Sequence, residues 1–294
     1  LSDINLQYLG TKEGFYWLRD ENHMFRIGFK DKNKNLNLHN IRVQLEGNGI
    51  YTFGIKSIID LLKNSLLKGF ITGYAPVSRA DLNSFIQYDL GFINKTMFST
   101  RKRKYSTINE IGTANEIQTI YVGKPPFMLR IYNKSLEMKK SKKYDVMKEY
   151  FLNNDFNLEE TIFNIEFEMH RSHLRKYGID DIKDLFVNLE NIFKSAMDEI
   201  RLIDNSSVSE ERLKNNKYQA DTHPIWDQIK ASYRIGNFLQ NSMPIERIKR
   251  AVTIFNEQTY RSELIALFKK GLSRKFDFSV VDLTQLYITT QKEM

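Results

Sequence analysis

The stretch FNIEFEMHR at residues 163–171 decides the fold, because its polar and apolar residues alternate strictly. Successive side chains of a β-strand point to opposite faces of a sheet. One face of the predicted strand therefore carries Asn164, Glu166, Glu168 and His170, and the other face carries apolar side chains. The pattern predicts a strand of an antiparallel sheet that buries one face and presents acids on the other.

Two further segments, SRADLNSF (78–85) and MLRIYNK (128–134), show the same alternation. If the three strands share one sheet, their polar faces coincide. One surface then combines carboxylates, guanidinium groups, an imidazole and a tyrosine. These two segments contribute Arg79, Asp81, Asn83, Arg130, Tyr132 and Lys134 to it.

Carboxylates together with one imidazole are suitable ligands for Mg²⁺ or Mn²⁺. Such an ion polarises a phosphodiester and stabilises the negative charge that develops on its oxygens. A nearby tyrosine oxygen can attack the phosphorus covalently. Because the reference pKa of tyrosine is about 10, a nucleophilic Tyr132 requires positive charge close by, from a metal, Arg130 or Lys134.

Each feature also has a plain structural interpretation, which the residues alone leave open. A sheet with one solvated face alternates in the same way, and tyrosine is a favoured strand residue. His170 or His173 alone is more typical of a surface or hydrogen-bonded histidine than of a ligand. The basic runs RKRK (101–104) and KKSKK (139–143) are typical of solvated surfaces, although DNA-binding proteins use such runs to contact phosphates. The candidate DNA-contacting residues are Arg79, Arg101, Lys102, Arg103, Lys104, Lys139 and Lys140.

The composition favours a polyanionic partner. The chain has 294 residues and a net charge of +8, and binding to a polyanion gains from phosphate contacts and counterion release. It has no cysteine, which excludes disulfides and thiolate chemistry and suits a reducing cytoplasm. We find no apolar run of about 18 residues and no signal-peptide pattern, so we expect no membrane span and no membrane partner.

The order of segments predicts an α+β fold. A central antiparallel sheet with helices packed on one face, and a polar face open to DNA, is expected over residues 1–203, and a helical region over 204–294. Strands are predicted at 14–20, 23–30, 39–47, 77–89, 107–134 and 161–171, with a turn at Pro125–Pro126. Helices are predicted at 54–70, 135–154, 180–203, 225–239, 244–271 and 280–291, with a loop or linker at 205–224.

Taken together, three blocks resemble the Rep_trans family of rolling-circle replication initiators of plasmids and phages, to which relaxases of some integrative elements are related. SRADLNSF is similar to the family's Arg-x-Asp-Leu strand. YVGKPPFMLRIYNKSLE (121–137) is similar to its Tyr/Phe-x-Gly stretch followed by Arg-Ile-Tyr-Asn/Asp-Lys and an acid. FNIEFEMHRSHLRKYGIDDIKDL (163–185) is similar to its acidic strand and following helix, and HPIWDQI (223–229) is a weaker fourth match.

The resemblance implies a function and a set of roles. Tyr132 corresponds to the nicking tyrosine, Lys134 to a residue beside the scissile phosphate, and Asp81, Glu166 and Glu168 to positions that hold a divalent metal. The implied activity is origin binding, as duplex and at a single-stranded nick site, with metal-dependent nicking and rejoining through a 5′-phosphotyrosine. The implied setting is the bacterial cytoplasm, with a host helicase and a second copy of the chain as further partners.

Two positions depart from the family pattern. Phe85 stands where family members often carry a second acid, and Asn164 stands where an arginine precedes the first glutamate. Which of Glu166, Glu168 and His170 bind metal therefore stays open. The role of the region after residue 200 stays open as well, among origin specificity, dimer contacts and helicase recruitment.

Three other functions compete with a replication initiator. A relaxase for conjugative transfer would use the same chemistry, and a non-catalytic DNA-binding protein would keep the fold without it. A tyrosine recombinase would use a tyrosine near the C-terminus, such as Tyr260 or Tyr287. The strand-rich first half argues against that mostly helical class.

Overall fold

The computed structural model describes residues 4–31, 39–70, 74–100, 108–113, 116–141, 144–236 and 238–247. Residues 1–247 form one compact unit. The helix predicted at 280–291, and most of the one predicted at 244–271, lie outside the described residues.

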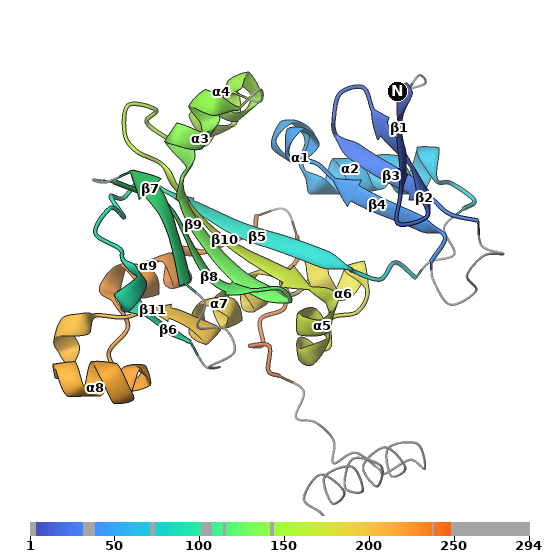
Figure 1. The fold of residues 1–294 in the computed structure, drawn as a ribbon. Coiled ribbons are helices and arrows are strands. Elements are labelled where there is room, and N and C mark those ends of the chain that lie inside the picture. The colour runs from blue at the N-terminus through green and yellow to red at the C-terminus, as the bar shows by residue number, and fades with distance from the viewer. Residues whose placement is uncertain are drawn as a thin grey trace, which may run out of the picture. The chain divides into compact units, whose positions relative to one another are not determined.

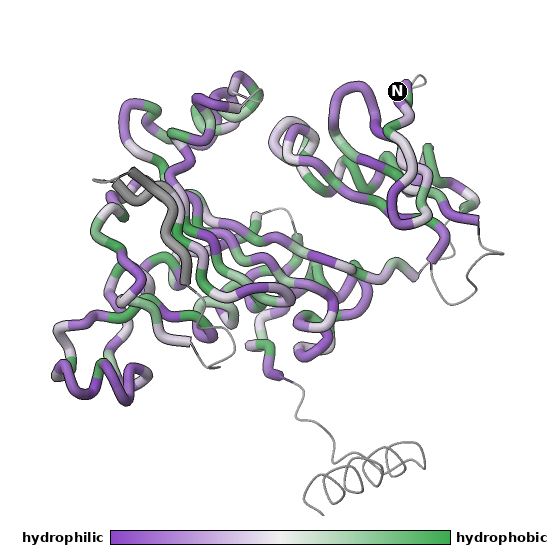
Figure 2. The backbone as a smooth tube through the Cα atoms, in the orientation of Figure 1, coloured by the Kyte–Doolittle hydropathy of each residue, from purple (hydrophilic) through white to green (hydrophobic). Residues whose placement is uncertain are grey.

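A five-stranded antiparallel sheet forms the centre of this unit (Figure 1), with the strand order β5-β10-β9-β8-β7. The predicted α+β class with a central antiparallel sheet is confirmed. The predicted strands that supply the polar surface are also confirmed. Hydrophilic and hydrophobic residues alternate along these strands (Figure 2). The strands are β5 (Arg79–Ile86), β7 (Ile108–Thr113), β8 (Glu116–Lys124), β9 (Phe127–Asn133) and β10 (Phe163–His170).

Helices α7 (Leu189–Glu199) and α9 (Pro224–Ser232) pack against the apolar face of this sheet. The fully buried Phe167 of β10 lies between them, with its ring centroid 5.4 Å from that of Phe193 and 6.3 Å from that of Trp226. The Trp226 indole N–H donates a hydrogen bond to a backbone carbonyl of α7. Buried aromatic side chains of this kind dominate core energetics.

The prediction of a single long helix over residues 180–203 is wrong. The segment forms α6 (Ile182–Phe186), α7 and the strand β11 (Ile200–Leu202), which pairs with β6 (Phe98–Thr100). Asp181 begins α6 with a capping box. The first residue of β11 is a β-branched isoleucine in an extended conformation, which ends the α7 helix and favours strand pairing.

A second antiparallel sheet, in the order β1-β2-β3-β4, lies N-terminal to the central one. The predicted hairpin is confirmed as β2 and β3, and the predicted alternation at 39–47 is confirmed as β4. The sequence did not predict β1. The strands are β1 (Leu6–Lys12), β2 (Phe15–Asp20), β3 (Phe25–Phe29) and β4 (Ile41–Leu45).

Residues 47–49, which include two glycines, begin helix α1 (Gly47–Phe53). Helix α2 (Ile55–Leu61) and a π-helical turn at residues 62–66 follow. Gly49 permits the close packing of this corner, because a Cβ there would lie 2.8 Å from Ile58 Cδ1 and 2.8 Å from Met24 Cβ.

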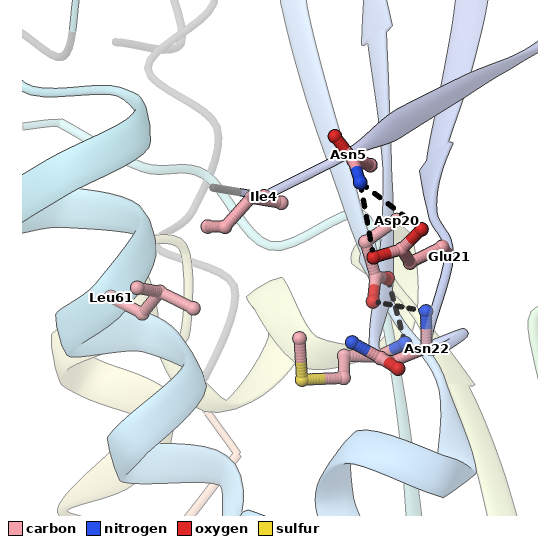
Figure 3. A pocket seen from close by; sticks show the side chains of 7 residues that line it. Ile4, Asn5, Asp20, Glu21, Asn22 and Leu61 are labelled. Carbon is pink, nitrogen blue, oxygen red and sulfur yellow. Dashed lines mark hydrogen bonds between the residues drawn. The ribbon is translucent and has the colours of Figure 1, made fainter. Parts of the chain in front are cut away.

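A small pocket lies beside the β2–β3 turn (Figure 3). Its buried acid, Asp20, accepts hydrogen bonds from the backbone N–H groups of Asn22, Met24 and Phe25, at 3.1, 2.7 and 2.7 Å. An acid that binds its own backbone in this way stabilises a turn. The pocket contains none of the residues on the predicted polar surface.

The remaining elements are short. The helix predicted at 135–154 is confirmed as two helices separated near Ser141. The loop predicted at 205–224 contains one α-helix and two short 3-10 helices. No helix in the described ranges is long and apolar enough to cross a membrane. These helices are α3 (Lys134–Lys140), α4 (Tyr144–Leu152), α5 (Arg171–Leu174) and α8 (Glu210–Asn215).

The boundary predicted after residue 203 stays a prediction, and the position of α9 makes it testable. Trp226→Ala should lower the free energy of unfolding of the whole sheet unit by about 3–5 kcal/mol, because Trp226 fills the space above Phe167. Urea unfolding followed by circular dichroism measures this. Leu239→Ala is the matched control, since Leu239 is 90% exposed. A loss in Trp226→Ala no larger than in the control would separate α9 from the sheet unit.

Candidate active site

The polar faces of β5, β10 and β9 meet on one side of the central sheet, as the alternation predicts. Strand β10 lies in the middle and is antiparallel to both neighbours. Cβ atoms of directly opposed residues in such pairs lie about 4.5–5.5 Å apart, so the side chains can interact. The opposed pairs are Glu168–Asp81, Glu166–Arg130 and Asn164–Tyr132.

Two arginines hold the three carboxylates of this face. Nη2 of Arg79 lies 2.6 Å from Asp81 and 2.9 Å from Glu168. Arg130 is hydrogen-bonded to Glu166, and its Nη2 lies 3.4 Å from Glu168 and 3.7 Å from Asp81. The Glu168 side chain is only 6% exposed, and a charge buried to that extent requires such pairing.

His170 extends the network at its exposed end, where its Nε2 lies 2.7 Å from a Glu168 oxygen. At the other end, desolvation raises the pKa of Glu166 and the Asp81 charge raises it further, while the Arg130 guanidinium opposes both effects. The hydrogen bond to Asp81 raises the pKa of Arg79. Glu168 is the more buried of the two glutamates, since its side chain is 6% exposed and that of Glu166 is 15% exposed.

Tyr132 is partly buried and lies beside Asn164. Its oxygen accepts a hydrogen bond of 2.8 Å from the side-chain amide of Asn164, which is 2% exposed. Burial raises the pKa of Tyr132 and the Glu166 charge raises it further; the Asn164 hydrogen bond and the Arg130 charge lower it. The phenol is thus neutral at neutral pH in this state, so attack requires added positive charge at the oxygen or the phosphate.

The predicted position of Lys134 on the face of the β9 strand is wrong. The strand ends at Asn133, whose side chain accepts a hydrogen bond from the backbone N–H of Leu136 and so begins α3. Lys134 is the first residue of that helix and is buried, with Nζ 2.6 Å from Glu137. Its Nζ still lies 5.8 Å from the centre of the Tyr132 ring, so the residue is near the tyrosine although it comes from a different element.

The candidate DNA-contacting residues fall into two groups. Lys139 and Lys140 are exposed in the last turn of α3, and the Arg79 side chain is 45% exposed. The basic run Arg101–Lys104 lies outside the described residues.

An aromatic cluster, which the sequence did not predict, packs on the polar face near Tyr132. Phe85 lies on the same face of β5 as Asp81 and Asn83. Its ring centroid lies 4.9 Å from that of Phe151 in α4. The ring centroid of Tyr150 in α4 lies 4.8 Å from that of Tyr51 in α1. The signal was available, since an apolar ring on a polar face indicates that something packs over it.

His173 belongs to the buried side of the sheet. Its ring is fully buried and stacks on Phe127, with centroids 4.1 Å apart. Its Nε2 lies 3.7 Å from the buried Glu199, whose carboxylate also accepts hydrogen bonds from Tyr177 and Arg247. This residue therefore lies in the core and not on the polar surface.

The residues of this face fit a divalent metal in chemical type but not in arrangement. Asp81, Glu166 and Glu168 are suitable in chemical type. Within the described ranges, however, no three acidic or imidazole groups lie close enough to one another to hold a metal ion. Guanidinium nitrogens of Arg79 and Arg130 occupy the space where the carboxylate oxygens converge. The geometry therefore does not fit a bound metal while these ion pairs persist.

No family model and no curated protein matches this chain. A solved structure of the rolling-circle replication initiator protein from Geobacillus stearothermophilus is similar to it, with a TM-score of 0.47 and 15% sequence identity. The similarity covers 77% of this chain and 81% of that chain.

The ion pairs predict a pH-dependent change in stability. Arg130→Met leaves Glu166 and Glu168 poorly compensated, and should lower the free energy of unfolding by about 2–3 kcal/mol at pH 8. The loss should be smaller at pH 5. A carboxyl whose folded-state pKa is raised costs stability as pH rises through that pKa, and protonation of Glu166 removes the cost.

Urea unfolding of the wild type and the variant at the two pH values measures the effect. The double variant Arg130→Met/Glu166→Gln should recover part of the stability at pH 8, because the unpaired charge is gone. An equal loss at both pH values would contradict the assignment of the effect to Glu166.

Proposed function

We propose that this protein is a rolling-circle replication initiator that binds origin DNA and nicks one strand through Tyr132. The observation that carries the proposal is the position of the Tyr132 hydroxyl, hydrogen-bonded to Asn164 on a sheet face that also holds two arginines and three carboxylates. The three-block resemblance and the net charge of +8 support the same function.

The chemistry is a transesterification. The Tyr132 oxygen attacks the phosphorus of the scissile phosphodiester, and the bond from phosphorus to the 3′ oxygen breaks. The phenol proton passes to solvent and the departing 3′ oxygen takes up a proton, which leaves a 5′-phosphotyrosine and a free 3′-OH. Because the new ester retains the bond energy, a later 3′-OH reverses the step without ATP.

Arg79 and Arg130 supply positive charge for this reaction. Guanidinium groups form paired hydrogen bonds to phosphate oxygens and stabilise the charge that develops there. Without DNA, the two groups are neutralised by Asp81, Glu166 and Glu168. A phosphate that recruits the arginines leaves these carboxylates unpaired. Binding of Mg²⁺ or Mn²⁺ by the freed carboxylates is part of the proposal.

The other partners follow from the charge pattern and the resemblance. Lys139 and Lys140 are exposed and suited to contact the phosphates of duplex DNA, and we propose the same for Arg101–Lys104. A host helicase, a second copy of the chain and a cytoplasmic setting in bacteria complete the proposal. A relaxase acting in conjugative transfer remains the second candidate, because the same face would serve it; a neighbouring replication origin or a transfer gene cluster separates the two.

Tyr132→Phe should abolish nicking, because the variant keeps the ring and loses the attacking oxygen. The assay incubates supercoiled DNA carrying the candidate origin with protein and Mn²⁺ or Mg²⁺. Wild type should yield open circles and a covalent protein–DNA adduct, and the variant should yield neither.

Tyr121→Phe is the matched control. Tyr121 of β8 lies opposite Arg130 and so on the same face, but it does not belong to the hydrogen-bonded network around Asn164. Adduct formed by Tyr132→Phe would remove Tyr132 as the nucleophile, and full origin binding with no wild-type nicking would favour the non-catalytic DNA-binding protein.

A second experiment tests the carboxylates. Asp81→Asn and Glu168→Gln should each slow nicking by at least about 100-fold at saturating Mn²⁺, a loss in the range reported for removal of one charge-stabilising group. Affinity for duplex origin DNA should stay within about threefold, because phosphate contacts from other residues supply most of it.

Glu149→Gln, at an exposed position of α4, is the control and should nick at the wild-type rate. Unchanged nicking in both site variants would exclude Asp81 and Glu168 from the reaction.

A further inference from the structure

We infer that Asn164 is a positioning residue, which orients the Tyr132 hydroxyl for attack, and that Asn83 fixes the orientation of Asn164. This inference rests on the proposed function. It concerns a position at which the sequence departs from the pattern of the family it resembles, so the resemblance assigns Asn164 no role.

The hydrogen bonds of Asn164 connect three strands. Its side-chain oxygen accepts a hydrogen bond of 3.1 Å from the Asn83 amide of β5. Its side-chain nitrogen donates to the Tyr132 oxygen of β9 at 2.8 Å and to a Glu166 oxygen at 3.3 Å. Both N–H groups and the carbonyl oxygen of this buried amide therefore have partners, as a buried polar group requires.

These partners permit one orientation of the amide. An ionised Glu166 only accepts hydrogen bonds, so the Asn164 nitrogen has to face it. With its nitrogen on that side, the Asn164 oxygen faces Asn83 and accepts a hydrogen bond from the Asn83 nitrogen. Rotation of the Asn164 amide by half a turn would place oxygen against Glu166 and nitrogen against nitrogen at Asn83.

The fixed orientation has a direct consequence for Tyr132. With one lone pair of its oxygen occupied by Asn164, the hydroxyl hydrogen and the other lone pair point away from β10. The donor also stabilises the oxygen as the phenol proton leaves, the state in which a hydrogen bond to a developing charge is strongest. Asn164 thus acts through the nucleophile.

Other charged and titratable groups also face the tyrosine. Arg130 lies on the same strand, Glu166 on β10, and Tyr51 on α1. Lys134 and Glu137, both on α3, pair with one another. Their influence is electrostatic, whereas Asn164 donates a directed hydrogen bond to the oxygen.

The experiment measures the single-turnover rate of adduct formation at saturating single-stranded oligonucleotide, and separately the Kd for that oligonucleotide. Asn164→Ala should slow the reaction by about 100-fold, a value typical for loss of one such donor, with Kd within about threefold of wild type. Asn164→Asp, which keeps the shape of the side chain, should be as slow, because its oxygens repel the developing phenolate.

Asn83 provides the test of the chain of hydrogen bonds. Asn83→Ala should slow the reaction by about tenfold, and the double variant Asn83→Ala/Asn164→Ala should be no slower than Asn164→Ala, because the two act in series. Asn83→Asp should be slower than Asn83→Ala, since an acceptor at this position turns the Asn164 amide and presents its oxygen to Tyr132. Urea unfolding monitors the fold, and if Asn164→Ala is unfolded, the order of the two Asn83 variants decides.

The outcomes separate the inference from the proposed function. Wild-type rates in Asn164→Ala and Asn164→Asp, with a Tyr132-dependent adduct, would overturn the inference and leave the proposed function intact. The inference would also be overturned if the rate losses of the two single variants added in the double variant. A change in the Kd for the oligonucleotide without a change in rate would overturn it as well, since either result indicates a structural role. Failure of the wild type to form an adduct would overturn the proposed function and the inference together.

Discussion

The pairing of β10 with β5 on one side and β9 on the other is the constraint on which the rest of the structure depends. Each residue of β10 from Phe163 to Met169 is opposed by a residue of both neighbours, so the acids meet the arginines, and Asn164 meets Tyr132, through register alone. A slip by one residue would turn Phe167 to the polar face and Glu166 and Glu168 into the core. The burial of Phe167 between two helices therefore fixes the site as well as the fold.

The sequence predicted the part of the site that obeys this periodicity. Strand alternation and the family resemblance predict one shared face for Asp81, Arg130, Tyr132, Glu166 and Glu168. Lys134 was misplaced because a cap formed by the side chain of Asn133 ends the strand one residue earlier. Phe85 on the polar face indicates that something packs over it, but no local pattern shows that the distant Phe151 does so. The break between α7 and β11 likewise depends on tertiary pairing, with β6, and not on helical periodicity.

The electrostatic balance of the face explains how ionised groups tolerate burial there. Three carboxylates share two guanidinium groups, and most of their oxygens are thereby satisfied within the protein. Such a network costs desolvation energy, and it is retained where charge serves a purpose beyond stability. Guanidinium groups also bind phosphates, so under the proposed function a phosphate competes with the acids for the same two arginines.

The strand order divides the face into a firmly held part and a part held on one side. Strand β10 has hydrogen-bonded neighbours on both sides, whereas β5 is at one end of the strand order of the described sheet. Amide hydrogens in a central strand exchange with solvent chiefly on global opening, while those of an outer strand exchange through local fraying. Asn164, Glu166 and Glu168 are therefore attached to backbone expected to exchange slowly, and Arg79 and Asp81 to backbone expected to open more readily. Rearrangement of the ion pairs thus has a natural direction, in which the β5 side moves and the β10 side stays in place.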